Sequence, residues 1–426
     1  MMKGARGVTG CERRVLQIVN PDREELPAFL RTYRAQGSSR ADIPRVLVNL
    51  NMGTGWSRGV LRGFTAFAHE RGWTLLHYPP PVDLGGLVKR FAPAAVVIGP
   101  DTNRVSLAQL PPLPLVSVAL DLSSDGIASV CPDEGRAAAL ALEHLLATGL
   151  RQVSTFRLDG SAFGVARERA FVERAREAGA RVAVGWGSEE GGRLWRGEDP
   201  EAMVAWLLGL PKPCGIFTCA DHWARVVARY IRLVGLRVPE DLALVGVDND
   251  VVECELLAPP LSSVMIAWQE LGCSAAKLVE RALAGESIEG ELISSPPVEV
   301  IARRSSEVLA IDDALVARAV RWLREHVDQR LTVPMVARAV GGGRQRLERR
   351  FRRVLDRSVR EEIRRARVEA AKALLRSTRV GLPEVARRSG FSNAALLSVA
   401  FKRELGMPPG VYRRRVHRAL ASTSEH

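Results

Sequence analysis

Polar side chains follow several short apolar runs in the first two-thirds of the chain, where they could hydrogen-bond the hydroxyl groups of a small ligand. Asp133 ends one such run, and Asp221 ends another. Asp248 and Asn249 together end a third. Carboxylate and amide oxygens accept hydrogen bonds from hydroxyl groups, and ligands of parallel α/β sheets bind outside the carboxyl ends of the strands. The pattern predicts an effector site, with capping of the following helix or turn as the alternative for each Asp.

Two further side chains follow the first apolar run. Trp56 could stack against the C–H face of a sugar ring, and the cation of Arg58 lies two residues later. The alternatives are packing in the core for Trp56 and a solvated helix position for Arg58. No metal or cofactor site is predicted, and no catalytic motif of a hydrolase, zinc enzyme or nucleotide-binding loop is present.

These candidate residues lie between elements of an alternating α/β pattern. We predict strands at 45–51, 73–78, 94–99, 114–120, 127–133, 152–158, 181–186, 214–221 and 242–249, and helices at 57–72, 134–148, 165–178, 200–209 and 222–234. Continuous Val, Ile and Leu runs joined by helices indicate a parallel sheet covered on both faces. Because the strands are too many for one doubly wound sheet, we predict two lobes, with a boundary near residues 149–151.

Basic residues are concentrated in the last quarter of the chain. The 426 residues carry a net charge of +13, and residues 311–426 hold 27 Lys and Arg against 12 Asp and Glu. The rest of the chain holds 34 basic and 36 acidic residues and is nearly neutral. A basic domain joined to a neutral one is the pattern expected for binding to the phosphates of double-stranded DNA.

The same basic region contains an internal repeat. VPMVARAVGGG (333–343) matches LPEVARRSGFS (382–392), and FRRVL (351–355) matches FKREL (401–405). Each copy has the pattern of a short helix, a glycine turn and a second helix, which is typical of a helix-turn-helix. A long helix over residues 361–378 is predicted to join the two copies, with Ile363, Ala366, Ala370 and Leu374 on its apolar face. The repeat therefore predicts two DNA-binding units.

This region resembles the AraC family of regulators. The resemblance is carried by LERRF (347–351), RVEAAKALL (367–375), EVARRSGFSN (384–393) and FKRELGMPPGVYRR (401–414). It implies that the second helix of each unit enters a major groove and that one monomer spans two successive grooves.

The two predicted recognition helices differ in their exposed residues. The first presents polar residues: Arg344, Gln345, Glu348, Arg349 and Arg352. Gln345, Glu348 and Arg349 match the positions with which the family reads base edges, and such groups can discriminate bases. The second presents apolar residues at the matching positions, with two cations available for phosphates: Ala395, Leu396, Val399, Lys402 and Arg403. Sequence specificity is therefore predicted to be concentrated in the first unit.

The α/β region resembles the type I periplasmic-binding fold of LacI/GalR regulators, and the chain from Arg45 onward resembles the XylR-type xylose-responsive regulators. The motifs are SRGVLRGF (57–64), ARERAF (166–171), VPEDLALVGVDND (238–250), LSSV (261–264), GCSAAKLVERALAG (272–285) and PPVEVIARRSS (296–306). The resemblance implies a monosaccharide effector such as D-xylose between the lobes, with Arg167 among its ligands. It also implies a homodimer, and RNA polymerase as a partner if the protein is an activator. Regulation by a different small molecule is the alternative.

Three other classes of protein are less favoured. A G-x-G-x-x-x-G run at 53–59 is similar to a dinucleotide fingerprint, but its third glycine is one residue late and the next strand ends without an acidic residue. A sugar-binding transport protein would share the fold but not the basic domain. A Cys-dependent DNA repair protein needs a reactive cysteine in a basic, exposed setting. The six cysteines contain no C-x-x-C pair and are predicted to be buried small hydrophobic residues.

We therefore predict a two-lobed, periplasmic-binding-protein-like α/β sensor domain followed by an all-α AraC-type domain with two helix-turn-helix units. The predicted segments are an extension at 1–42, the effector-binding domain at 43–306, a linker at 307–313, the DNA-binding domain at 314–418 and a tail at 419–426. No early apolar run has the length of a signal peptide or membrane span, so a cytoplasmic, non-membrane protein without enzymatic activity is expected.

Overall fold

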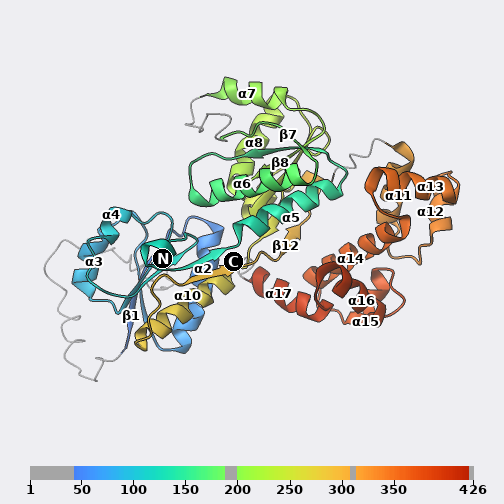
Figure 1. Ribbon diagram of the computed structural model, residues 1–426. Coiled ribbons are helices and arrows are strands. Elements are labelled where there is room, and N and C mark those ends of the chain that lie inside the picture. The colour runs from blue at the N-terminus through green and yellow to red at the C-terminus, as the bar shows by residue number, and fades with distance from the viewer. Residues whose placement is uncertain (1–42, 188–198, 308–312, 422–426) are drawn as a thin grey trace, which may run out of the picture. The chain divides into compact units, whose positions relative to one another are not determined.

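The computed structural model describes residues 43–187, 199–307 and 313–421 (Figure 1). The predicted extension at 1–42, most of the linker at 307–313 and the last residues of the tail lie outside the described residues, as does Cys11.

The first lobe is built on a six-stranded sheet with the order β11-β5-β4-β3-β1-β2, in which every neighbouring pair is parallel. Its strands are β1 (Arg45–Asn49), β2 (Thr74–His77), β3 (Ala95–Ile98), β4 (Leu115–Val118), β5 (Ala128–Pro132) and β11 (Leu292–Ser295). Val48 of β1 lies opposite Val97 of β3, and both side chains are buried. Burial of consecutive residues on a strand is what a sheet covered on both faces requires.

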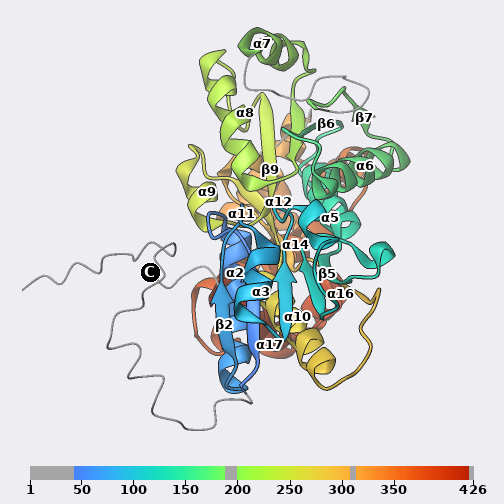
Figure 2. The same cartoon turned by 90° about the vertical axis from the view of Figure 1, so that its left-hand side faces the viewer.

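The second lobe contains another six-stranded sheet, with the order β12-β10-β9-β8-β6-β7. Its strands are β6 (Gln152–Phe156), β7 (Arg181–Val182), β8 (Cys214–Thr218), β9 (Leu242–Asp248), β10 (Ser262–Met265) and β12 (Glu299–Ile301). Only β12 is antiparallel to its neighbour. The two lobes confirm the predicted fold, and Figure 2 shows β2 and β5 in one lobe and β6, β7 and β9 in the other.

Helices cover both sheets. They are α2 (Gly55–Glu70), α3 (Leu84–Phe91), α4 (Arg104–Leu107), α5 (Glu134–Ala147), α6 (Ala162–Glu177), α7 (Pro200–Gly209), α8 (Asp221–Leu233), α9 (Val251–Leu256) and α10 (Trp268–Leu283). Helices α2 and α10 pack so closely that a Cβ atom on Gly63 would lie 2.0 Å from the backbone oxygen of Gln269. A Cβ on Gly59 would lie 2.7 Å from the Cβ of Trp268. The third glycine of the G-x-G-x-x-x-G run therefore serves close helix packing.

The chain crosses between the sheets at a place that differs from our prediction. Helix α5 packs on α6 and on the second sheet, so the first crossing lies directly after Pro132 and not near residues 149–151. Further crossings follow β10 and β11. The helical pattern of α5 cannot reveal which sheet it covers, because the strands before and after it are equally apolar. Three short strands, β10, β11 and β12, were also absent from the predicted set.

The C-terminal region is entirely helical over its described residues. It consists of α11 (Ala314–Glu325), α12 (Val333–Ala339), α13 (Arg344–Leu355), α14 (Val359–Ser377), α15 (Leu382–Arg388), α16 (Ala394–Leu405) and α17 (Pro409–Ala421). We call α11–α13 the first unit and α15–α17 the second unit; α14 joins them (Figure 1). The turn glycines that match in the repeat, Gly341 and Gly390, both adopt left-handed backbone angles, with φ of 69° and 76°. Only glycine adopts such angles without strain.

Helix α14 packs on more than the face we predicted. Ile363 is buried as expected, but Ala366, Ala370 and Leu374 are only half-buried. The most buried residues of its second half are Val368, Ala371 and Leu375, one position further along. The shift follows from the two units, since the first half of α14 contributes to the core of the first unit and the second half to that of the second.

Candidate effector site and DNA-binding surface

A buried arginine forms the centre of a charged group at the ends of the second lobe's elements. Arg167 of α6 is 2% exposed and donates from Nε to Glu134, the first residue of α5. Its Nη1 donates to the carbonyl oxygen of Cys219 at 2.7 Å and lies 3.5 Å from Oδ1 of Asp248. Its guanidinium also lies over the ring of Phe163. We call Glu134, Arg167 and Asp248 the effector cluster.

Burial and charge together shift the pKa values of this cluster. Burial raises the pKa of Asp248 to about 7, although the Arg167 cation opposes the shift. Burial likewise raises the pKa of Glu134. Burial disfavours the charged form of Arg167, but Glu134 and Asp248 outweigh it and hold the pKa of Arg167 above its usual value. The cluster therefore contains a permanent cation beside two carboxyl groups whose ionised forms are disfavoured by burial.

Asp248 is held in an unusual position. Its Oδ1 is buried and has no hydrogen-bond partner among the described residues. Its backbone has a φ of 110°, and that of Asn249 has a φ of 52°. Left-handed backbone angles at non-glycine residues are costly and often occur where a binding site requires them. A small hydroxyl-bearing ligand could donate to Asp248 Oδ1.

Asp221 and Asn249, two other sequence candidates, are engaged in hydrogen bonds within the lobe. Asp221 is the first residue of α8; it accepts from Ser263 Oγ at 2.6 Å and from the backbone N–H of Asp250 at 2.9 Å. Asn249 accepts from Arg303 at 2.8 Å through its side-chain oxygen. Burial raises the pKa of Asp221 well above its usual value. These two side chains support the segment that carries Asp248.

The remaining sequence candidates lie close to the same region. Asp133 caps α5 by accepting from the backbone N–H of Arg136 at 2.8 Å, which is the alternative we considered for it. Trp56 is half-buried and packs on Trp268 with ring centroids 5.6 Å apart. Arg58 is also half-buried and lies 3.9 Å from Asp250.

Sequence reasoning missed two residues of this region, Glu134 and Asp250. Glu134 follows the candidate Asp133 directly, and an acidic residue in the first turn of a helix is ordinarily explained by the helix dipole. Asp250 ends the VPEDLALVGVDND motif, but its Oδ2 contacts Gly55 in the other lobe. Only the folded chain brings these partners together.

The cysteines of the described residues are buried or half-buried. Cys214, Cys219 and Cys254 are buried, and Cys131 and Cys273 are half-buried. Burial raises the pKa of both Cys131 and Cys214 to about 12, so these thiols stay protonated. Within the same residues, no helix is long and apolar enough to cross a membrane.

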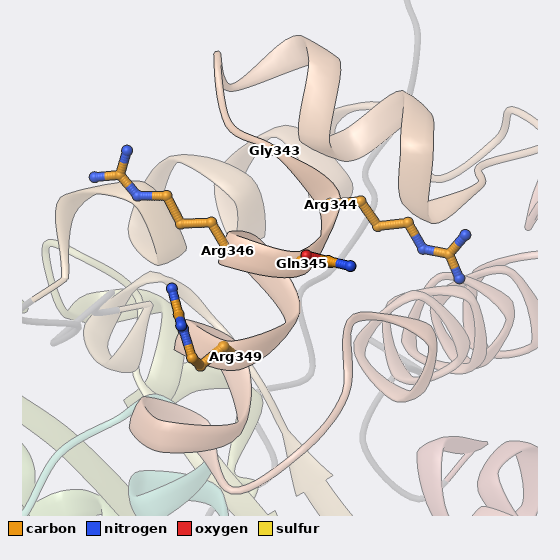
Figure 3. A pocket seen from close by; sticks show the side chains of 5 residues that line it. All are labelled: Gly343, Arg344, Gln345, Arg346 and Arg349. Carbon is orange, nitrogen blue, oxygen red and sulfur yellow. The ribbon is translucent and has the colours of Figure 1, made fainter.

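The first recognition helix, α13, presents a dense basic surface. A hollow at its start is lined by Gly343, Arg344, Gln345, Arg346 and Arg349. Figure 3 shows Arg344 and Gln345 extending to one side of the helix and Arg346 and Arg349 to the other. Gly343 is the N-cap and offers no side-chain hydrogen bond, so the backbone N–H groups of the first turn stay accessible.

The predicted base-reading residues of α13 lie on its surface. Arg349 and Arg352 are exposed, and neither forms an ion pair with another described residue. Glu348 is half-buried and lies 3.6 Å from Nε of Arg344, one helical turn away. The surface can therefore offer free guanidinium groups to phosphates or guanine edges.

The second recognition helix, α16, presents an apolar surface. Leu396 is 50% exposed and Val399 is 66% exposed, and Ala395 lies beside them on the surface. Lys402 and Arg403 are exposed near the end of the helix. Asn393 caps the helix by accepting from the backbone N–H of Leu396 at 2.9 Å. The structure places all five predicted residues of this helix on the surface.

Comparisons with known proteins agree with this architecture. A model described as a periplasmic binding protein-like domain matches residues 142–306, and a model described as a helix-turn-helix domain matches residues 336–415. The solved structure of the xylose-binding transcription activator xylR matches with a TM-score of 0.55 and 25% identity, covering 87% of this chain and 97% of that chain. The lac repressor dimer bound to operator shares the fold, with a TM-score of 0.53 at 15% identity, covering 67% of this chain and all of that chain.

Two sequence relatives carry the same name. The xylose operon regulatory protein of Escherichia coli K12 is 30% identical over 276 residues, which are 64% of this chain and 70% of that protein. The protein of that name from Haemophilus influenzae is 28% identical over 277 residues, 64% of this chain and 71% of that protein. With a two-lobed sensor domain, an AraC-type pair of helix-turn-helix units and these relatives, the chain belongs to the family of xylose operon regulatory proteins, which are DNA-binding, sugar-responsive transcription regulators.

Proposed function

We propose that the effector is a monosaccharide, with D-xylose the first candidate, and that the effector cluster binds its hydroxyl groups. The observation that carries the proposal is Asp248 Oδ1, a buried acceptor that has no hydrogen-bond donor among the described residues and lies 3.5 Å from a buried arginine. A buried polar atom without a partner is costly, so a ligand hydroxyl that donates to it gains binding free energy. The names of the relatives support xylose among the sugars.

Calorimetric titration of the full chain against pentoses and hexoses tests this proposal. We expect a heat of binding with D-xylose and an affinity about tenfold or more lower in Asp248→Asn, because a hydrogen bond to a charged group contributes about 1.5–3 kcal/mol. Asp241→Asn is the matched control, since Asp241 lies in the same lobe but pairs with Arg237 on the surface. If no simple sugar gives heat, the effector is a different small molecule and the proposal is wrong.

We propose in addition that the protein acts in the cytoplasm as a homodimer and has no enzymatic activity. A dimer of 46.5 kDa chains presents two pairs of helix-turn-helix units to a double-stranded operator. If the protein is an activator, RNA polymerase is its further partner. Light scattering on the purified chain tests the dimer, and recovery of unchanged sugar after incubation tests the lack of enzymatic activity.

We propose that α13 reads base edges through Gln345, Glu348 and Arg349, with Arg344 and Arg352 beside them, and that α16 contacts DNA through apolar groups and phosphate-binding cations. The exposed guanidinium groups of α13 and the exposed Leu396 and Val399 of α16 support this division. Selection of binding sites from randomised DNA tests it. We expect one informative block of bases in each monomer's site; two equally informative blocks would contradict the division.

A further inference from the structure

One carboxylate connects the two lobes of the sensor domain. Asp250 is the N-cap of α9 in the second lobe, where its Oδ1 accepts from the backbone N–H of Val252 at 3.0 Å. Its other oxygen, Oδ2, accepts from the backbone N–H of Gly55 at 3.1 Å and lies 3.9 Å from Nη2 of Arg58. Gly55 and Arg58 belong to α2 of the first lobe.

Helix α2 depends on this carboxylate for the capping of its first turn. The side chain of its own N-cap, Thr54, contacts Ser57 Oγ and caps no backbone N–H group of the helix, so Asp250 of the opposite lobe binds the first N–H group instead. An anion at a helix N-terminus is favourable, because the N–H groups and the helix dipole are both positive there. The approach is close, since a Cβ on Gly55 would lie 2.3 Å from Asp250 Oδ2.

Arg58 adds a second attraction to the same oxygen. Its Nη1 donates to the carbonyl oxygen of Met52 at 2.9 Å, which holds the guanidinium beside the start of α2. Asp250 therefore meets a helix N-terminus and a positioned cation, both from the other lobe.

Asp250 is also connected to the effector cluster. It lies two residues after Asp248, and its backbone N–H donates to the buried Asp221 at 2.9 Å. The two residues before Asp250, Asp248 and Asn249, have left-handed backbone angles, which leave this turn little freedom to adjust. Movement of α2 away from α9 is thus expected to disturb the same turn that presents Asp248.

We infer that Asp250 is a positioning residue that holds the two lobes together and so raises effector affinity without touching the effector. This inference rests on the proposed function. Apparent affinity falls in proportion to the fraction of molecules in the binding-competent arrangement, and Asp250 increases that fraction. Arg58, a candidate effector ligand from the sequence, acts in this account through Asp250.

The variant Asp250→Ser separates the connection between lobes from local capping. Serine is a good N-cap, so α9 keeps its first turn, but its side chain is too short to reach Gly55. In the sugar-free protein, we expect hydrogen exchange at the Gly55 amide to become about tenfold faster, since this amide loses its acceptor. In calorimetry with D-xylose, we expect the affinity to fall about fivefold or more.

Two further variants provide a matched control and a partial rescue. Asp83→Ser changes an N-cap of α3, whose side chain accepts from Gly86 at 3.0 Å within the first lobe, and is expected to alter neither measurement. Asp250→Asn keeps an acceptor for Gly55 but loses the charge beside Arg58, so both measurements should fall between those of the wild type and Asp250→Ser.

Each result decides a different part of the inference. Unchanged exchange at Gly55 in Asp250→Ser would overturn the connection between the lobes. Faster exchange with unchanged D-xylose affinity would overturn its effect on the effector. If the wild-type protein binds no D-xylose, the proposed function fails, whereas the exchange measurement still decides whether Asp250 holds the lobes together.

Discussion

The two helix-turn-helix units share their buried residues and differ on their surfaces. In the recognition helices, Leu347 and Phe351 of α13 correspond to Leu397 and Phe401 of α16, and all four are fully buried. The exposed positions carry a dense set of arginines on α13 and mainly apolar residues on α16. The fold of a unit requires only the buried positions, so the exposed ones are free to differ between the two units.

The units also differ in what completes their cores. The core of the first unit is formed by α11–α13 and the start of α14. That of the second unit includes Met265 and Ile301 from strands of the sensor domain. The second unit is therefore packed against the sensor, whereas the first has a core of its own. The more polar recognition surface belongs to the unit that depends less on the sensor.

A buried ion cluster supports the packing of the second unit. Glu299 of β12 is 5% exposed and lies 2.8 Å from Lys372 Nζ and 3.3 Å from Arg376 Nη1 of α14. It also accepts a hydrogen bond from the hydroxyl group of Tyr412 in α17. Charges buried together are tolerated only when each has its partners.

The largest expected effect comes from removing the carboxylate of that cluster. Glu299→Ala leaves Lys372 buried without this partner, and we expect the free energy of unfolding to fall by about 3–5 kcal/mol. Glu404→Ala is the control, because its pair with Arg364 is near the surface and contributes about 1 kcal/mol or less. Denaturant titration of both variants measures the difference. Equal, small losses would mean that Glu299 does not stabilise the packing of the second unit against the sensor.

A fall in pH is expected to lower the free energy of unfolding through His144, which lies in the sensor domain close to charged residues of α14. Burial lowers the pKa of His144 of α5 from 6.5 to about 4, and Lys372 and Arg324 act in the same direction while Glu369 opposes them. Its ring lies 2.7 Å from Ser306 Oγ. The folded state keeps this histidine neutral while the unfolded state gains a proton, so its contribution is present above about pH 6.5 and lost as the pH falls toward 4.

The expected loss from His144 is about 3 kcal/mol over that range. Carboxylates titrate there as well, so the measurement is the difference in unfolding free energy between the wild type and His144→Gln at each pH. If the two plots of unfolding free energy against pH run parallel, protonation of His144 does not contribute to the loss of stability in acid.

The variant Arg349→Ala tests whether the first unit reads a base edge. We expect binding to weaken by about 1–3 kcal/mol at one base pair and preference to relax there, because a guanidinium group can make two hydrogen bonds to guanine. Fluorescence anisotropy with single-base variants of the operator measures it. A uniform loss across all sequences would assign Arg349 to a phosphate.

The smallest effect is expected from Lys402→Ala in the second unit. Its loss should weaken binding by about 1 kcal/mol or less and evenly across sequences, and should flatten the dependence of affinity on salt, because one phosphate contact disappears. Titrations at several salt concentrations measure the slope. A sequence-dependent effect would show that α16 reads bases near this position.

Much of this architecture could be predicted from local patterns. The repeat at 333–343 and 382–392, the concentration of basic residues after residue 311, and the apolar strands depend on neighbouring residues or on simple counts. Helical periodicity and glycine turns are dictated by short-range geometry, so the two units and the two-lobed sensor were predicted correctly. Asp248 was a candidate from its position at a strand end and Arg167 from the family resemblance, and the structure places their side chains 3.5 Å apart.

Contacts between residues that are far apart in the sequence could be found only in the tertiary structure. Asp250 caps a helix that begins 195 residues earlier, Glu299 pairs with Lys372 of another domain, and α5 covers the second sheet. No local pattern encodes such partners, because a carboxylate at a helix start or on a short strand has the same sequence signal whether it faces water or another lobe. The carboxylates of Asp250 and Glu299 stabilise the structure because they are buried against their partners, and burial is a property of the folded chain alone.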